Sequence, residues 1–272
     1  MSRENEKIIS KLDPTLISKL KTLELKAKTV VEGFKVGLHR SPYHGFSVEF
    51  SEHKAYMQGD PIKNIDWKVF GKSDRLFVKQ FEEETNLSCH ILLDISASMD
   101  YKEKGILTKL EYGRILAASL SYLMITQQDS VGISLFSDKI ESYFPPRSSK
   151  VYLQSLLKGL ENINPDNKTE TAICLNSIAE KINKRGLVII ISDFFDDVDK
   201  ISNALKHFKY KKNEVIIFQI LDPIEKSFAF ENDAIFLDKE TKDEITTQPH
   251  QLKNDYQIAM KEYLEKLKNV CL

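Results

Sequence analysis

The chain has 272 residues, enough for one large domain or two small ones, and its hydrophobic content of 42% can fill a sizeable core. Charged residues make up 29%, and the formal net charge of −1 gives no electrostatic reason to expect nucleic acid or an anionic membrane as a partner. No apolar run approaches the ~18 residues of a membrane-spanning helix, and the first residues lack the apolar segment of a signal peptide. The cysteines form neither a CxxC pair nor a disulfide framework, so we expect a cytoplasmic protein.

Residues 1–28 are expected to form an N-terminal helical segment. Apolar residues from Ile8 to Leu25 recur among many lysines, which is typical of an amphipathic helical region. Pro14 suits the first turn of a helix that Asp13 caps. The apolar stripe either forms a surface for a partner or, as we favour, packs on the rest of its own chain.

Residues 29–88 are expected to form a small β-rich segment. The alternating runs Phe46–Phe50 and Leu76–Phe81 are typical of strands. Between them lie the turn Gly59-Asp60-Pro61 and the only tryptophan of the chain, Trp67.

Residues 89–272 alternate between short apolar runs and amphipathic stretches. The runs that predict strands are Ile91–Leu93, Val131–Phe136, Leu187–Ile191, Val215–Leu221 and Ala234–Leu237. Helical spacing of apolar residues predicts helices over 109–128, 149–162, 173–182, 201–208 and 252–270. The last strand leads into a polar, hairpin-like segment near Lys239. This alternation predicts an α/β fold with a doubly wound, mostly parallel sheet that helices cover on both faces.

The run Ile91–Leu93 ends abruptly in Asp94-Ile95-Ser96-Ala97-Ser98. One acid and two hydroxyls therefore follow the carboxyl end of a strand, which is where ligands bind in open α/β sheets. Carboxylate and hydroxyl oxygens are hard donors that suit Mg²⁺, Mn²⁺ or Ca²⁺. The alternative is a strand followed by a helix-capping turn, because Asp and Ser are both good N-caps.

The segment Asp94–Met99 resembles the metal-ion-dependent adhesion site of von Willebrand factor A domains. In that family a threonine from a later loop and an aspartate after the fourth strand complete the metal site. The resemblance implies the ligands Asp94, Ser96, Ser98, Thr169 and Asp193. Lys168 stands where the family usually has a glycine, which leaves Thr169 and Thr171 both open as the threonine ligand, with Thr169 favoured.

More acids follow Asp193, namely Asp196, Asp197 and Asp199. They either raise the local cation concentration or form a solvated loop and helix start, where the helix dipole favours negative charge. Both interpretations stay open at this point.

The first third of the chain carries a second resemblance. The pattern Tyr56-x-x-Gly59-Asp60-x-x-Lys63-x-Ile65-Asp66-Trp67, followed by Leu76–Glu82, is similar to the signature of the DUF58 family. These are bacterial proteins with a von Willebrand factor A-like domain, commonly encoded beside MoxR-type AAA+ ATPases. The resemblance runs from about Gly45 to the C-terminus. Arginine is common in the family where this chain has Lys54 and Lys63, and lysine lacks the bidentate fork of arginine.

Two functions follow from these patterns. The five expected ligands supply fewer oxygens than the six that Mg²⁺ prefers, so a partner's carboxylate can complete the shell, as the resemblance implies. We therefore expect a non-enzymatic, metal-dependent protein interaction module that acts with a MoxR-type AAA+ ATPase in protein assembly or remodelling. The alternative is a Mg²⁺-dependent phosphohydrolase of the haloacid dehalogenase type, which requires a second aspartate where the chain has Ser96.

Overall fold

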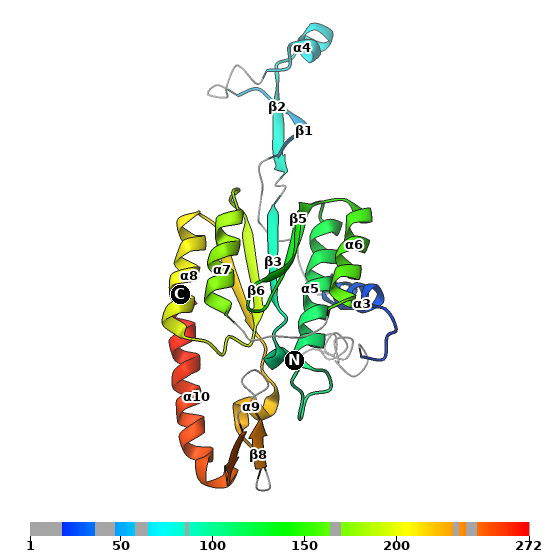
Figure 1. The fold of residues 1–272 in the computed structure, drawn as a ribbon. Coiled ribbons are helices and arrows are strands. Elements are labelled where there is room, and N and C mark those ends of the chain that lie inside the picture. Colours follow the sequence, from blue (N-terminus) through cyan, green and yellow to red (C-terminus); the bar gives the residue numbers. More distant parts are fainter. Residues whose placement is uncertain are drawn as a thin grey trace, which may run out of the picture. The chain divides into compact units, whose positions relative to one another are not determined.

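A computed structural model describes residues 18–35, 47–57, 65–84, 87–163, 170–230, 234–237 and 244–271 (Figure 1). The chain divides into two compact units. One comprises residues 1–38 and 88–272, and the other comprises residues 39–87. The expected segment over 1–28 falls largely outside the described residues, as do the turn Gly59-Asp60-Pro61 and Thr169.

The larger unit is built on a five-stranded sheet with the order β5-β4-β3-β6-β7. The central strand is β3 (Ser88–Asp94), and it pairs in parallel with β4 (Ser130–Phe136) and with β6 (Leu187–Ser192). Strand β7 (Glu214–Gln219) continues the parallel order, whereas β5 (Ile140–Arg147) is antiparallel to β4. The predicted α/β fold with a mostly parallel sheet is therefore confirmed.

Helices cover both faces of this sheet (Figure 1). On one face lies α5 (Lys109–Thr126), with α6 (Lys150–Glu161) and α3 (Leu23–Lys35) beside it. On the other face lie α7 (Thr171–Lys181) and α8 (Val198–Tyr210), with α10 (Pro249–Cys271) packed on α8.

Strand side chains alternate between the two helical layers, as the pleat of a strand requires. Leu92 and Ile190 belong to the hydrophobic cluster on the α7–α8 face. Leu93 and Ile191 face α5, where a Cβ on Gly113 would lie 2.9 Å from the Leu93 side chain. Residues 91–93 form a continuous apolar run because both faces of β3 are covered.

Strand β5 was not among the predicted strands. Its residues alternate between half-buried and exposed, as expected for a strand with one covered face. It contains Pro145 and Pro146, which a sheet tolerates at an edge, and β5 is the edge strand here.

Strand β8 (Ala234–Leu237) lies outside the main sheet and pairs antiparallel with β9 (Glu244–Thr247). The predicted hairpin-like arrangement is thus found, although its connection falls outside the described residues. Next to it in the chain is the short helix α9 (Pro223–Ser227). The Phe228 ring that follows α9 stacks on Tyr256 of α10, with centroids 4.2 Å apart.

In the described part of the smaller unit lie β1 (Ser47–Ala55), β2 (Phe77–Glu84) and α4 (Trp67–Ser73). The two strands pair antiparallel, which confirms both strands predicted there. Asp66 caps α4 by accepting hydrogen bonds from the backbone of Lys68 and Val69.

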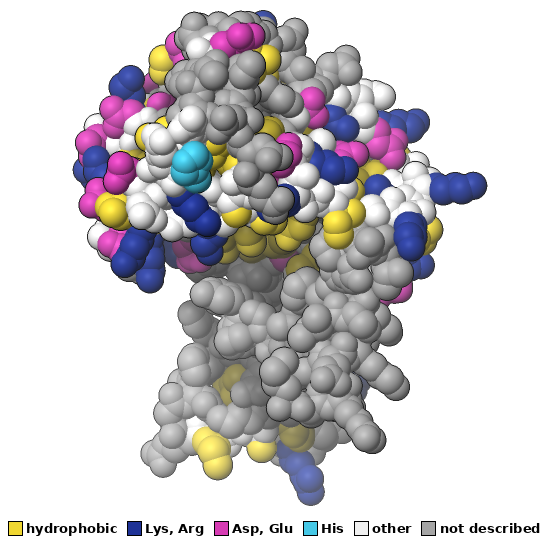
Figure 2. Space-filling model, turned by 90° about the horizontal axis from the view of Figure 1, so that it is seen from below, with side chains coloured by type: hydrophobic (Ala, Val, Ile, Leu, Met, Phe, Trp, Pro, Cys, Tyr) yellow, Lys and Arg dark blue, Asp and Glu magenta, His cyan; other side chains and the backbone are white. Residues whose placement is uncertain are grey.

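The face of the molecule in Figure 2 carries acidic and basic side chains interspersed with one another. This mixture agrees with the formal net charge of −1. Among the helices that the structure describes, none is long and apolar enough to cross a bilayer.

Candidate metal centre

Asp94 is the last residue of the central strand, and its side chain is completely buried. Its Oδ1 accepts a hydrogen bond of 3.0 Å from the backbone N–H of Ser96, and its Oδ2 accepts one of 2.6 Å from the hydroxyl of Ser192. Ser192 ends the neighbouring strand β6, and its hydroxyl also accepts from the N–H of Phe194. The carboxylate therefore joins the ends of two adjacent parallel strands.

Ser96 and Ser98 stand beside this carboxylate on the turn into η2 (Ala97–Asp100), a short 3₁₀ helix. Their hydroxyl oxygens lie 3.0 Å apart, with Ser96 buried and Ser98 partly exposed. Each hydroxyl has two acceptor lone pairs, so both can turn an oxygen toward a common cation. Three of the expected ligands thus come together in one short segment.

Asp193 follows β6 directly and is also buried. Its Oδ2 lies 2.8 Å from the ammonium of Lys109, and its Oδ1 accepts from the N–H of Phe195 at 3.3 Å. The ammonium of Lys109 also lies 2.7 Å from Oε1 of Glu225. Asp193 is therefore next to the motif, as expected, but it is already paired with a cation of the protein.

Neither Lys109 nor Glu225 was predicted to belong to the site. Lys109 is the first residue of α5, directly after the cap Thr108. A cation is unfavourable at a helix N-terminus because the dipole is positive there. This local conflict was the one sequence signal that pointed to a buried partner for Lys109.

Burial and charge shape the protonation of the cluster. Burial, followed by the charge of Asp193, raises the pKa of Asp94 from 3.8 to about 7. Burial alone would lower the pKa of Lys109, but the negative charges of Asp193 and Glu225 have the larger effect, so the pKa is raised. Lys109 is therefore charged at neutral pH, whereas Asp94 exchanges its proton near neutrality.

Of the two threonine candidates, the favoured Thr169 lies outside the described residues, so only Thr171 can be placed. Thr171 is the first residue of α7 and is fully buried, and its hydroxyl has no hydrogen-bond partner within the described part of the chain. The N–H of Glu170 donates to the carbonyl of Ser137, which follows β4, and this bond holds the start of α7 at the same edge of the sheet. Buried hydroxyls in proteins normally have a hydrogen-bond partner, so this hydroxyl is available to a water or a cation.

The acids after Asp193 have structural roles in the described structure. Asp197 caps α8 by accepting from the N–H groups of Asp199 and Lys200. Asp196 accepts from the N–H of Asp197, and Asp199 pairs with Lys266 at 3.0 Å. The helix-start interpretation of this run is the one that the contacts favour.

The donor set suits a small hard cation. Within the described ranges no group of three or more His, Cys, Asp or Glu side chains could hold a metal ion. A cation at this edge would therefore depend on the hydroxyls of Ser96, Ser98 and a threonine, with charge from the two aspartates. Carboxylate oxygens that accept one hydrogen bond keep a further lone pair, so Asp94 and Asp193 remain available to an ion or to its water.

Comparisons with known proteins identify a family and a set of relatives. The family described as "Protein of unknown function DUF58" matches residues 52–266. Uncharacterized proteins of Mycobacterium bovis and Mycobacterium tuberculosis are 23% identical over 232 residues, which cover 84% of this chain and 72% of theirs.

Solved structures also match, among them the two that follow. An aerotolerance-related membrane protein from Bacteroides fragilis aligns with 67% of this chain and 99% of its own, at 20% identity and a TM-score of 0.45. The conserved hypothetical protein BatB from Bacteroides thetaiotaomicron aligns with 68% and 98%, at 18% identity and a TM-score of 0.44.

Proposed function

The chain belongs to the DUF58 family, and from this membership and the site geometry we propose that it is a metal-dependent protein interaction module and not an enzyme. The observation that carries the proposal is the cluster of Asp94, Ser96 and Ser98 at the carboxyl edge of the sheet. Asp193 and the orphaned hydroxyl of Thr171 lie at the same edge. Mg²⁺ is the cation that such oxygens suit best, and Mn²⁺ or Ca²⁺ can replace it.

The strand order supports a von Willebrand factor A-like domain as the setting of this site. The motif follows the central strand β3, and Asp193 follows the adjacent strand β6. When a cation is bound, it supplies positive charge and an open coordination position. Ser96, Ser98 and the threonine would hold the ion, and the two aspartates would balance its charge.

A protein partner fits the surroundings of the site. Large apolar side chains are exposed on three segments that carry site residues, namely Ile106 before α5, Ile173 on α7 and Phe195 after Asp193. Exposed apolar side chains of this kind are typical of surfaces that bind a partner. The partner that we propose is a cytoplasmic MoxR-type AAA+ ATPase, on family grounds.

The test is co-purification of the full chain with the candidate ATPase in Mg²⁺ and in EDTA. We expect the ATPase to be recovered with the wild type in Mg²⁺ but not in EDTA. The Ser96→Ala/Ser98→Ala double variant should recover it in neither buffer. The matched control is Asp199→Asn, which removes an exposed acid that pairs with Lys266. Equal recovery of wild type and double variant in both buffers would refute a partner contact through this site.

The phosphohydrolase alternative is tested on the same preparation. Ser96 occupies the position of the second catalytic aspartate, and its hydroxyl bonds with that of Ser98. A serine hydroxyl is a poor acid or base near neutral pH. We expect no Mg²⁺-dependent hydrolysis of p-nitrophenyl phosphate. Hydrolysis by the wild type that is lost in Asp94→Asn would instead show that the protein is an enzyme.

A further inference from the structure

The ammonium of Lys109 is buried in a closed environment of charges and rings. It lies 2.8 Å from Asp193 and 2.7 Å from Glu225. The rings of Tyr101 and Phe195 lie 5.8 and 5.3 Å from it, within cation–π range. Its side chain is 3% exposed, so these groups take the place of water around the charge.

From this arrangement we propose that Lys109 and Glu225 are positioning residues of the candidate metal centre, and that Glu225 of α9 sets its cation affinity from outside the ligand set. The inference rests on the proposed function, because it assumes that a cation binds beside Asp94. It assigns no contact with the cation to either residue. Both act through Asp193, whose carboxylate the ammonium holds.

The charges of the cluster support this role. Asp94, Asp193 and Glu225 contribute three negative charges when ionised, and Lys109 contributes one positive charge. The sum of −2 matches a divalent cation, and the Lys109–Glu225 pair itself adds no net charge. Removal of either partner alone leaves an unbalanced charge in a buried environment, where charges interact strongly.

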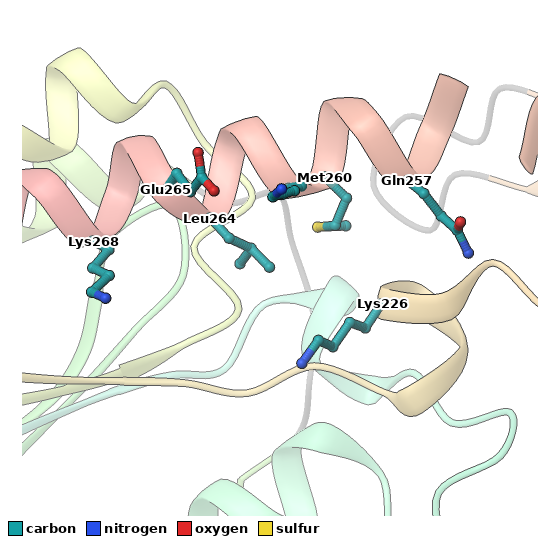
Figure 3. Close-up of a pocket in the computed structure, with 7 residues that line it drawn as sticks. Lys226, Gln257, Met260, Leu264, Glu265 and Lys268 are labelled. Carbon is teal, nitrogen blue, oxygen red and sulfur yellow. The ribbon is translucent and has the colours of Figure 1, made fainter. Parts of the chain in front are cut away.

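The second part of the argument concerns how firmly Glu225 is held. Its Oε2 accepts from the N–H of Asp222 at 2.7 Å, and its carbonyl accepts from the hydroxyl of Tyr256 on α10 at 2.6 Å. Gln257 of α10 also donates to the carbonyl of Ser227 at 2.7 Å. A groove of about 250 Å³ runs along α10 and is lined by residues of that helix, Gln257 among them, and by Lys226 of α9. Figure 3 shows Lys226 on α9 and Gln257 on α10.

The same short helix also holds the loop that follows the serines. The carboxylate of Asp222 accepts hydrogen bonds from the N–H groups of Glu103, Lys104 and Gly105, at 3.1, 3.3 and 3.0 Å. Residues at the start of α9 therefore connect to the site in two ways, through Asp222 to the 103–105 loop and through Glu225 to Lys109. These two connections link α9 and its cap residue Asp222 to the site.

Substitutions in the pair should change cation affinity in opposite directions. In Glu225→Gln the net charge of the cluster changes from −2 to −1, and the ammonium of Lys109 pairs with Asp193 alone. The affinity for a divalent cation should therefore fall roughly tenfold. In Lys109→Met the net charge of the cluster becomes −3, and Asp193 loses its pairing with the ammonium. The affinity for a divalent cation should therefore rise by a similar factor. The double variant restores the sum of −2 and should bind like the wild type.

Calorimetric binding of Mn²⁺ to the full chain tests this, with thermal unfolding in EDTA to confirm that each variant is folded. Lys266→Met is the matched control, because it removes one lysine from an exposed ion pair with Asp199. Lys109→Met can fail to fold, since it leaves buried carboxylates without a cation. In that case Glu225→Gln and the double variant decide the question.

The possible results separate this inference from the proposed function. A wild type that binds no Mn²⁺ refutes the proposed function and this inference with it. A wild type that binds, with Glu225→Gln of equal affinity, refutes the inference alone. Loss of affinity in every variant of the pair, the double variant included, indicates a purely structural role and also overturns it.

Discussion

Asp94→Asn is the substitution whose effect can be worked out most fully from the structure. The amide has the shape of the carboxylate, and it can still accept from the N–H of Ser96 and share a hydrogen bond with the hydroxyl of Ser192. What it removes is a negative charge on a completely buried side chain. Because hydrogen bonds and volume are retained, the change isolates the electrostatic cost of the charge.

The size and the sign of that cost follow from the pKa. Burial and the charge of Asp193 raise the pKa of Asp94 from 3.8 to about 7 in the folded protein. The folded state then binds the proton more tightly than the unfolded state. This tighter proton binding stabilises the folded protein fully below pH 3.8, and the stabilisation is lost as the pH rises to about 7. Over this range the free energy of unfolding falls by about 4 kcal/mol.

We therefore expect metal-free Asp94→Asn to be more stable than the wild type at pH 8, by about 4 kcal/mol, and equally stable near pH 4. Urea unfolding in EDTA across this range measures the difference, with Asp199→Asn as the exposed control. A constant difference between wild type and Asp94→Asn from pH 4 to pH 8 would refute the reasoning. With Mg²⁺ in excess, the difference in stability between Asp94→Asn and the wild type should become smaller or change sign, because the ion stabilises only the protein that binds it.

Two further substitutions test the packing and the threonine. Gly132→Ala should cost about 1–3 kcal/mol in urea unfolding, because its Cβ would lie 2.4 Å from the carbonyl oxygen of Phe144, whereas Gly71→Ala, with nothing within 4 Å, should not destabilise. Thr171→Val should leave stability unchanged or higher, since the hydroxyl has no partner in the described structure, and should weaken Mg²⁺ binding in calorimetry if this hydroxyl is a ligand. Unchanged affinity in Thr171→Val would leave Thr169 as the threonine of the site.

The central part of the fold was predictable because its signals are local. The run Ile91–Leu93 is buried on both faces, and such strands are apolar throughout. The acid and the two serines that follow it all lie in the short segment Asp94–Ser98, so their proximity needed no knowledge of the fold. Strand β5 was missed because Pro145 and Pro146 are unfavourable in a strand unless it lies at an edge, and edge position is a property of the whole sheet.

The charge balance of the site depends instead on contacts between distant parts of the chain. Lys109 is separated from Asp193 by 84 residues and from Glu225 by 116, so no local pattern joins them. What the sequence does contain is a conflict, a lysine at the first position of a helix where the dipole disfavours it. Natural sequences tolerate such conflicts mainly where another part of the fold compensates for them. The conflict at Lys109 therefore marks a residue whose charge is needed elsewhere, and the buried carboxylates of Asp193 and Glu225 are where the structure uses it.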